Sequence, residues 1–197
     1  MHPKVRQETP GRCPHCGMAL EDEKGNLSPI EPGPATTWRA YIPLITVIGL
    51  IAAATAALAF RDTLAGAFAL EATISTFMAG FFLVFAGFKL MDLKGFAEGY
   101  ATYDLLARPL PAYGFLYPFI ELGFGLSMLV GYHPDWLLWS EVAVMAFSGV
   151  GVAIKLAKKE PFTCACLGTF LKVPLTKVTL VEDFGMAALA GALLLLR

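Results

Sequence analysis

Two pairs of cysteines are the residues of this chain whose type and spacing suggest chemistry. The first pair lies in Cys13-Pro14-His15-Cys16-Gly17, where the proline restricts the turn and the glycine lets the backbone fold beneath the sulfurs. Two thiolates at this spacing can converge on one metal ion. A redox Cys-x-x-Cys motif usually opens a helix after a strand, whereas proline, glycine and charged residues flank this one. We therefore favour a metal site over a redox pair or two free thiols.

The Cys13–Gly17 motif, which we call the knuckle, supplies only two of the four ligands that a structural zinc site needs. The nearby candidates to complete the site are His2, His15 and Met18, with Met1 beside them. A low-coordination site rich in sulfur suits a soft ion, so we expect a soft heavy-metal ion, copper(I) in the first place and zinc as the alternative.

The second pair, Cys164-Ala165-Cys166, follows Glu160-Pro161-Phe162-Thr163. Two cysteines separated by one residue can pinch a soft metal ion, or they can form a small, strained and easily reduced disulfide. The lysines nearby are Lys158, Lys159 and Lys172, and they favour the reactive thiolate form over two buried, inert thiols.

Composition places these cysteines in a membrane protein. Of the 197 residues, 56% are hydrophobic and 16% are charged, whereas soluble domains average about 45–50% and about 25%. The net charge of −1 gives no electrostatic support for nucleic-acid binding. Stretches of about 20 apolar residues predict membrane-spanning helices near residues 40–60, 71–93, 113–132, 136–155 and 176–197.

The predicted fold is therefore an all-α polytopic membrane helical bundle of about five spans. The count falls to four if the last stretch does not cross, because a crossing there places Glu182 and Asp183 below the interface. Residues 94–112 read as an interfacial loop or short helix. We divide the chain into a polar metal-binding segment and linker at 1–37 and the bundle at 38–197.

Lysine and arginine residues predict the orientation, because they are enriched in cytoplasmic segments. With five spans and a cytoplasmic N-terminus, only Arg61 and Arg197 lie outside, and the other thirteen lie inside. We therefore expect a bacterial-type inner membrane protein whose four cysteines all face the cytoplasm, where disulfides are kept reduced.

Two glutamates interrupt the predicted spans, and a carboxylate inside a membrane is costly enough to suggest a functional site. Glu121 shares a helix face with Gly114, Pro118 and Gly125, and Glu141 shares one with Met145, Ser148, Val152 and Lys155. The two carboxylates could form a polar path for a proton or metal ion. Alternatively, Glu121 pairs with Lys89 or an amide and only fixes the packing. We expect Lys89 itself to extend to the inner surface.

The N-terminus resembles a short heavy-metal-binding module of copper and other heavy-metal exporters. The matching residues are Met1-His2-Pro3, Pro10-Gly11, Cys13-Pro14, Cys16-Gly17-Met18 and Leu20. The leading Cys-Pro of that module is absent here, which leaves one thiolate fewer.

Residues 38–197 resemble the DoxX-like and MauE-like redox-associated membrane proteins. The stretches that carry this resemblance are Phe77-Met78-Ala79-Gly80, Phe85-Ala86-Gly87-Phe88-Lys89, Pro118-Phe119-Ile120-Glu121-Leu122-Gly123 and Cys164-Ala165-Cys166-Leu167-Gly168. MauE-type proteins are implicated in the redox maturation of partner proteins, and the resemblance implies Cys164 and Cys166 as the redox pair.

Three hypotheses follow. In the first, the knuckle captures a soft metal, with a metal chaperone as a candidate partner, and relays it to Cys164 and Cys166. In the second, the protein is a thiol–disulfide oxidoreductase that acts on a redox partner protein and passes electrons to a quinone. In the third, it is a metal-responsive scaffold. Maturation of exported disulfides needs thiols on the oxidising side of the membrane, whereas the lysine and arginine count places Cys164 and Cys166 in the cytoplasm. We therefore rank metal handling first.

Overall fold

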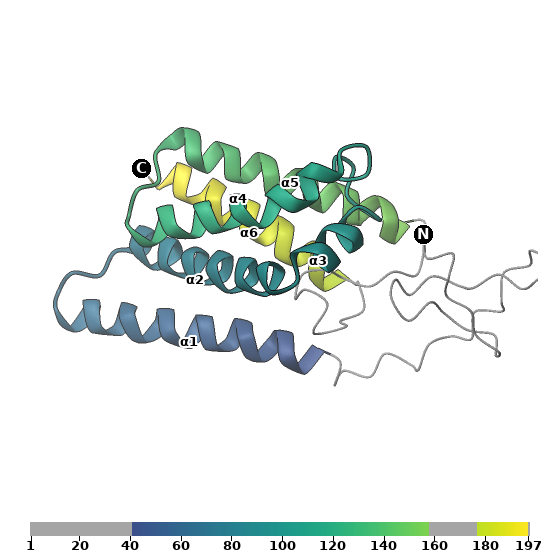
Figure 1. Cartoon of the computed structure of the whole chain (residues 1–197). Helices are drawn as coiled ribbons and strands as arrows, with labels where there is room; N and C mark the ends of the chain where they lie inside the picture. Colours follow the sequence, from purple (N-terminus) through teal and green to yellow (C-terminus); the bar gives the residue numbers. More distant parts are fainter. Residues whose placement is uncertain (1–40, 158–176, 197) are drawn as a thin grey trace, which may run out of the picture.

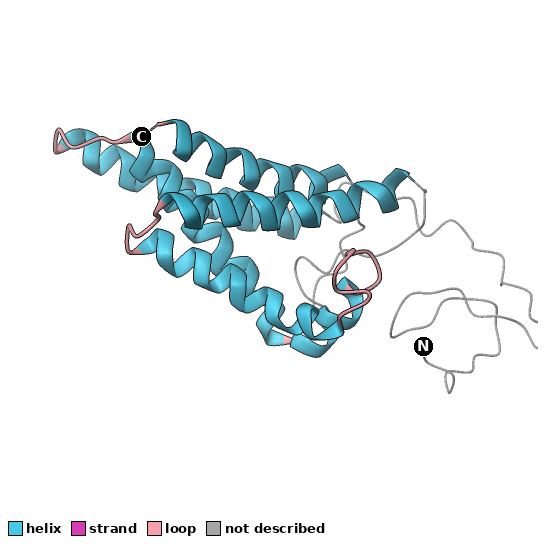
Figure 2. Cartoon of the chain, turned by 90° about the horizontal axis from the view of Figure 1, so that it is seen from above, coloured by secondary structure: helices cyan, strands magenta, loops and turns pink. Residues whose placement is uncertain are grey.

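The computed structural model describes residues 41–157 and 177–196, which form helices and connecting loops without any strand (Figure 2). The elements are α1 (Ile42–Leu64), α2 (Leu70–Met91), α3 (Leu93–Tyr100), α4 (Pro111–Leu129), α5 (Asp135–Ala157) and α6 (Lys177–Leu195). In lipid every backbone N–H and C=O needs an internal partner, and a helix supplies one within each segment. The predicted all-α bundle is confirmed.

Four of the described helices, namely α1, α2, α4 and α5, are long and apolar enough to cross a membrane. They correspond to the first four predicted spans. The fifth predicted span corresponds to α6, which packs along α5, and its crossing stays a prediction. The stretch between the second and third spans contains the short helix α3, as expected.

The helix ends follow local chemistry. A proline lies in the first turn of α1 and of α4, where a missing N–H leaves no helical bond unmade. Gly66 and Gly131 have φ values of +68° and +71°, so the turns after α1 and α4 use the left-handed region that suits glycine. The Asp92 carboxylate accepts a hydrogen bond from the Gly95 N–H at 3.0 Å and caps α3.

Helix α2 is the centre of the bundle, because it packs against α1, α3, α4 and α6. Its Phe82 is fully buried and lies 5.8 Å, centroid to centroid, from Phe124 of α4. Helix α1 packs against α2 at the edge of the bundle (Figure 1). Small residues let the helices approach closely, because a Cβ at Gly80 of α2 would lie 2.9 Å from the Ile51 side chain of α1. Gly87 has no such neighbour.

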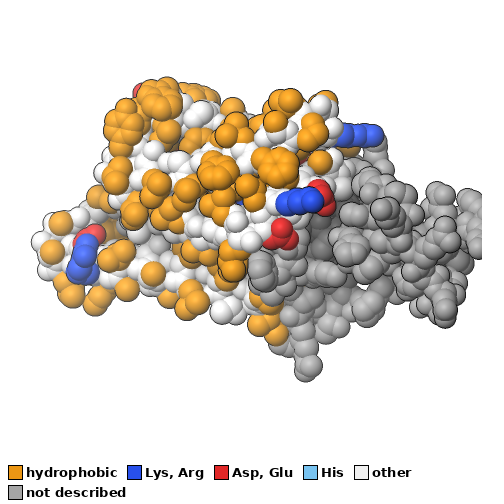
Figure 3. Space-filling model, viewed as in Figure 1, with side chains coloured by type: hydrophobic (Ala, Val, Ile, Leu, Met, Phe, Trp, Pro, Cys, Tyr) orange, Lys and Arg blue, Asp and Glu red, His pale blue; other side chains and the backbone are white. Residues whose placement is uncertain are grey.

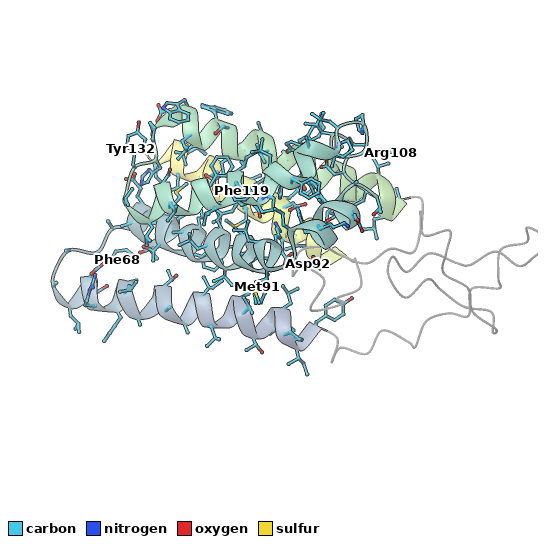
Figure 4. The ribbon with its side chains drawn as sticks, in the orientation of Figure 1. Phe68, Met91, Asp92, Arg108, Phe119 and Tyr132 are labelled. Carbon is cyan, nitrogen blue, oxygen red and sulfur yellow. The ribbon has the colours of Figure 1, made fainter. Side chains whose placement is uncertain are left out.

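The surface matches a membrane setting. Hydrophobic side chains cover the middle of the face in Figure 3, and charged side chains gather toward its two ends. Phe68 and Tyr132 lie at one end of the bundle, whereas Asp92 and Arg108 lie at the other (Figure 4). Helix α1 begins, α5 ends and α6 begins at this second end (Figure 1).

The cysteine motifs and the other predicted metal ligands lie outside the described residues. These are His2, Cys13, His15, Cys16, Met18, Cys164 and Cys166. The predicted boundary between residues 37 and 38 lies outside them as well.

Candidate functional site

A buried ion pair joins α2 to α4. The Lys89 ammonium donates hydrogen bonds to both carboxylate oxygens of Glu121, at 2.5 Å for Oε2. Only 6% of Lys89 and 3% of Glu121 are exposed. The prediction that Lys89 extends to the surface is therefore wrong, and the alternative that Glu121 pairs with Lys89 describes the contact. A charge this deep in an apolar bundle is tolerable because it is paired and hydrogen-bonded.

Aromatic rings surround this pair. The Lys89 nitrogen lies 4.9 Å from the ring centroid of Tyr117 and 5.4 Å from that of Phe96. Both rings belong to a stack that includes Tyr100, whose centroid is 4.6 Å from Tyr117 and 5.1 Å from Phe96. The faces of aromatic rings attract a cation, so the stack stabilises the ammonium where water cannot.

Beside the pair lies a small cavity of about 20 Å³, which is room for one water molecule. Helices α2 to α6 and the turn after α3 contribute to its lining. The lining residues are Lys89, Phe96, Tyr100, Tyr103, Tyr117, Ser148, Val152 and Asp183. The Tyr100 hydroxyl donates to Ser148 Oγ at 3.4 Å, which links α3 to α5 across the cavity.

The turn after α3 holds this wall in place. Asp104 is 1% exposed, and its Oδ1 accepts hydrogen bonds from the Leu106 and Ala107 N–H groups at 2.9 and 2.7 Å. A Cβ at Gly151 of α5 would lie 2.9 Å from the Tyr103 carbonyl oxygen, so the glycine lets α5 approach the turn. Burial, with Tyr117 and Asp104 adding to it, raises the pKa of the Tyr100 phenol, which therefore stays a neutral donor.

Glu141 occupies a separate position on α5. It is fully buried, and neither carboxylate oxygen has a hydrogen-bond partner within the described ranges. The predicted face is confirmed for the described side chains, since Met145, Ser148 and Val152 are buried with it. Ser148 is seven residues further along, about 10 Å by helical rise, so Glu141 is apart from the cavity.

On α4 the predicted face is also buried, and its members are Gly114, Pro118, Glu121 and Gly125. The two glutamates are not partners of one another, because Glu121 bonds to Lys89 and Glu141 has no bonded partner among the residues described.

The sequence reasoning missed most of this cluster. Asp183 was visible only as an obstacle to a fifth crossing, and the tyrosines of α3 and α4 gave no periodic signal of their own. The available signal was that Lys89, Glu121 and Asp183 are charged residues in three different predicted spans. Among the described residues, no group of three or more His, Cys, Asp or Glu side chains is arranged to hold a metal.

Comparison with known proteins gives two family matches. A family model described as methylamine utilisation protein MauE matches residues 66–196, which include α2 to α6. A second, described as heavy metal binding domain, matches residues 1–23.

A copper-exporting P-type ATPase of Legionella pneumophila is 57% identical over 30 residues. That match covers 15% of this chain and 4% of the ATPase, so the two proteins share a short module only. No solved structure matches.

Proposed function

Because this chain belongs to the methylamine utilisation protein MauE family and carries a heavy metal binding domain at its N-terminus, we propose that it captures a soft heavy-metal ion and relays it at the membrane. Copper(I) is the proposed ion. Cys13 and Cys16 capture it, with His2, His15 and Met18 as further ligands, and Cys164 and Cys166 receive it.

The observation that carries this proposal is the arrangement of the helix ends. The segment with the first pair leads into α1, and the segment with the second pair connects α5 to α6. Helix α1 begins, α5 ends and α6 begins at one end of the bundle (Figure 1). Both segments are therefore anchored on the same side, where thiolate exchange needs no passage through the bilayer.

Orientation follows from the same end of the bundle. In the proposed topology this end faces the cytoplasm of a bacterial-type inner membrane, where thiols stay reduced and available to metal. The described Lys94 and Arg108, on α3 and the loop that follows it, agree with that side, whereas Arg61 pairs with Asp62 near the end of α1 at the other side.

Relay between two thiolate pairs exchanges protons for metal. A thiol must lose its proton to bind the ion, so protons leave Cys164 and Cys166 as the ion arrives, and Cys13 and Cys16 take up protons as it departs. Glu141 is buried without a bonded partner in the described part of the chain, and it is our candidate for coupling proton uptake or release to metal transfer. We assign Glu121 to charge compensation of Lys89.

A second candidate function has the family match in its favour. The matched residues 66–196 include Cys164 and Cys166, and the implied role of MauE-type proteins in redox maturation supports a thiol–disulfide oxidoreductase that acts on a redox partner protein. In that function two thiols lose two protons and two electrons to a quinone and form the disulfide. Quinone-linked oxidation of these thiols in vesicles would support it over the relay.

Metal stoichiometry of the purified full chain tests the relay. We expect the chain loaded with copper(I) to lose about one copper equivalent in the variant Cys13→Ser/Cys16→Ser, and about one in Cys164→Ser/Cys166→Ser. Each pair is the matched control for the other. Unchanged copper in the first variant would exclude the knuckle as the capture site, and unchanged copper in the second would exclude the relay. Competition with zinc identifies the preferred ion.

A further inference from the structure

The cluster around Lys89 has more acidic than basic groups. Glu121 of α4 bonds directly to Lys89, and Asp183 of α6 lines the same cavity as Lys89. Asp183 is close enough to interact electrostatically with both members of that pair. If both carboxylates were ionised, one negative charge inside the bundle would have no matching cation at this site, which is costly in an apolar surrounding.

The groups that face the cluster come from every element packed around it. Lys89 comes from α2, Tyr100, Tyr103 and Asp104 from α3 and its turn, Tyr113, Tyr117 and Glu121 from α4, Ser148 from α5, and Glu182 and Asp183 from α6. Lys89 is the cation among these described groups. Asp104 Oδ1 accepts from two backbone N–H groups, and the ammonium of Lys89 donates to Glu121 and not to Asp104.

Asp183 lines this cavity and Glu121 does not, but Tyr117 lines it and is within hydrogen-bonding reach of Glu121, so the Tyr117 hydroxyl can connect the two carboxylates. The cavity has the volume of one water molecule, and the hydroxyl groups of Tyr100, Tyr117 and Ser148 belong to residues of its wall. The same volume excludes a quinone ring or a hydrated metal ion from this cavity.

We propose that Glu121 and Asp183 hold one proton between them, exchanged through the Tyr117 hydroxyl and a water molecule that the cavity can accommodate, so that these two acids together carry one negative charge opposite Lys89 and the cluster is a proton-binding site. Lys89 then has two alternative partners. When the proton resides on Asp183, Lys89 pairs with Glu121 as in the structure, and when it resides on Glu121, Lys89 is free to pair with Asp183.

The site lies toward the end of the bundle at which α5 ends and α6 begins. Asp183 is six residues after Lys177, about 9 Å along α6. The cluster is thus a proton store within reach of that end. This inference goes beyond the proposed metal relay and does not depend on it.

Infrared spectroscopy of the full chain in lipid tests the proposal, because a protonated carboxyl has a C=O band that shifts in heavy water. Each variant is compared with the unaltered chain by difference, so constant contributions of other carboxyls cancel. At neutral pH, we expect Asp183→Asn to remove one protonated carboxyl and Glu121→Gln to remove one as well, because either substitution leaves Lys89 with a single ionised partner. The double variant should lose one and not two.

Lys89→Met should have the opposite effect and gain one protonated carboxyl, because both acids then lack a cation. Asp62→Asn, at the opposite end of the bundle, is the control that should leave the cluster band unchanged. The proposal is overturned if either single variant keeps the band, if the losses add in the double variant, or if Lys89→Met gains no band. Should one variant fail to fold, any of these results in a remaining variant still overturns it.

Discussion

Replacement of Lys89 by Met removes the cation from the buried pair while keeping a flexible side chain of similar length. The Glu121 carboxylate then remains almost fully buried, at 3% exposure, without the ammonium that donates to both of its oxygens. Removing one partner of a buried ion pair costs about 3–5 kcal/mol, because the other charge is left uncompensated.

An independent estimate gives a similar value. The orphaned carboxyl can escape its charge by binding a proton from water. Holding that proton at pH 7 on a group that titrates near 4.3 in the unfolded chain costs about 3.7 kcal/mol. We therefore expect Lys89→Met to lower the free energy of unfolding by about 4 kcal/mol at pH 7.

The cost should depend on pH in a defined direction. Above about pH 4.3 the folded variant binds one more proton than the folded unaltered protein, so its stability falls as the pH rises, by about 1.4 kcal/mol per pH unit relative to the unaltered protein. At pH 6 the protonation cost should be about 2.3 kcal/mol.

The assay is unfolding of detergent-solubilised protein by sodium dodecyl sulfate, followed by tryptophan fluorescence. The matched control is Lys94→Met, an exposed lysine of α3 that should change stability by less than about 0.5 kcal/mol. The double variant Lys89→Met/Glu121→Gln should recover at least about 2 kcal/mol of the loss, since no charge of the pair remains. A loss below about 1 kcal/mol at pH 7, or a double variant as unstable as Lys89→Met, would refute the reasoning.

Other predictions concern packing and topology. Gly125→Ala should destabilise the α2–α4 contact by about 1–3 kcal/mol in the same unfolding assay, because its Cβ would lie 2.9 Å from an α2 side chain, whereas Gly123→Ala, with open space, should not. Asp104→Ala should cost about 1–3 kcal/mol in thermal unfolding, through two unsatisfied N–H groups at the cavity wall. In a chain without native cysteines, Tyr132→Cys should react with an impermeant thiol reagent on intact cells and Arg108→Cys only after permeabilisation; the reverse pattern would invert the topology.

The arrangement of helices was predictable because the bilayer constrains it so strongly. An uncharged stretch such as residues 40–60 has few alternatives to a spanning helix, and α1 at Ile42–Leu64 agrees with it within a few residues. The buried faces of α4 and α5 were predictable too, since helical periodicity alone places Glu121 and Glu141 among small and apolar neighbours.

The partners of the buried charges were not predictable, because a partner on another helix depends on tertiary packing. Lys89 lies close enough to the end of α2 to reach the surface, and only the position of α4 shows that Glu121 is nearer. The same holds for Gly87, which lies between Ala and Phe as Gly80 does, although of these two glycines only Gly80 contacts a neighbouring helix. Asp183 joined the site through the packing of α6 beside α2 and α5.

The sidedness of the native thiols tests the central claim most directly, because the relay requires both cysteine pairs in one compartment. An impermeant maleimide is applied to intact cells and to permeabilised cells that express Cys13→Ser/Cys16→Ser or Cys164→Ser/Cys166→Ser, so that each pair is read separately. We predict that both pairs react only after permeabilisation. Modification of Cys164 or Cys166 from outside would contradict the cytoplasmic relay and favour the oxidoreductase.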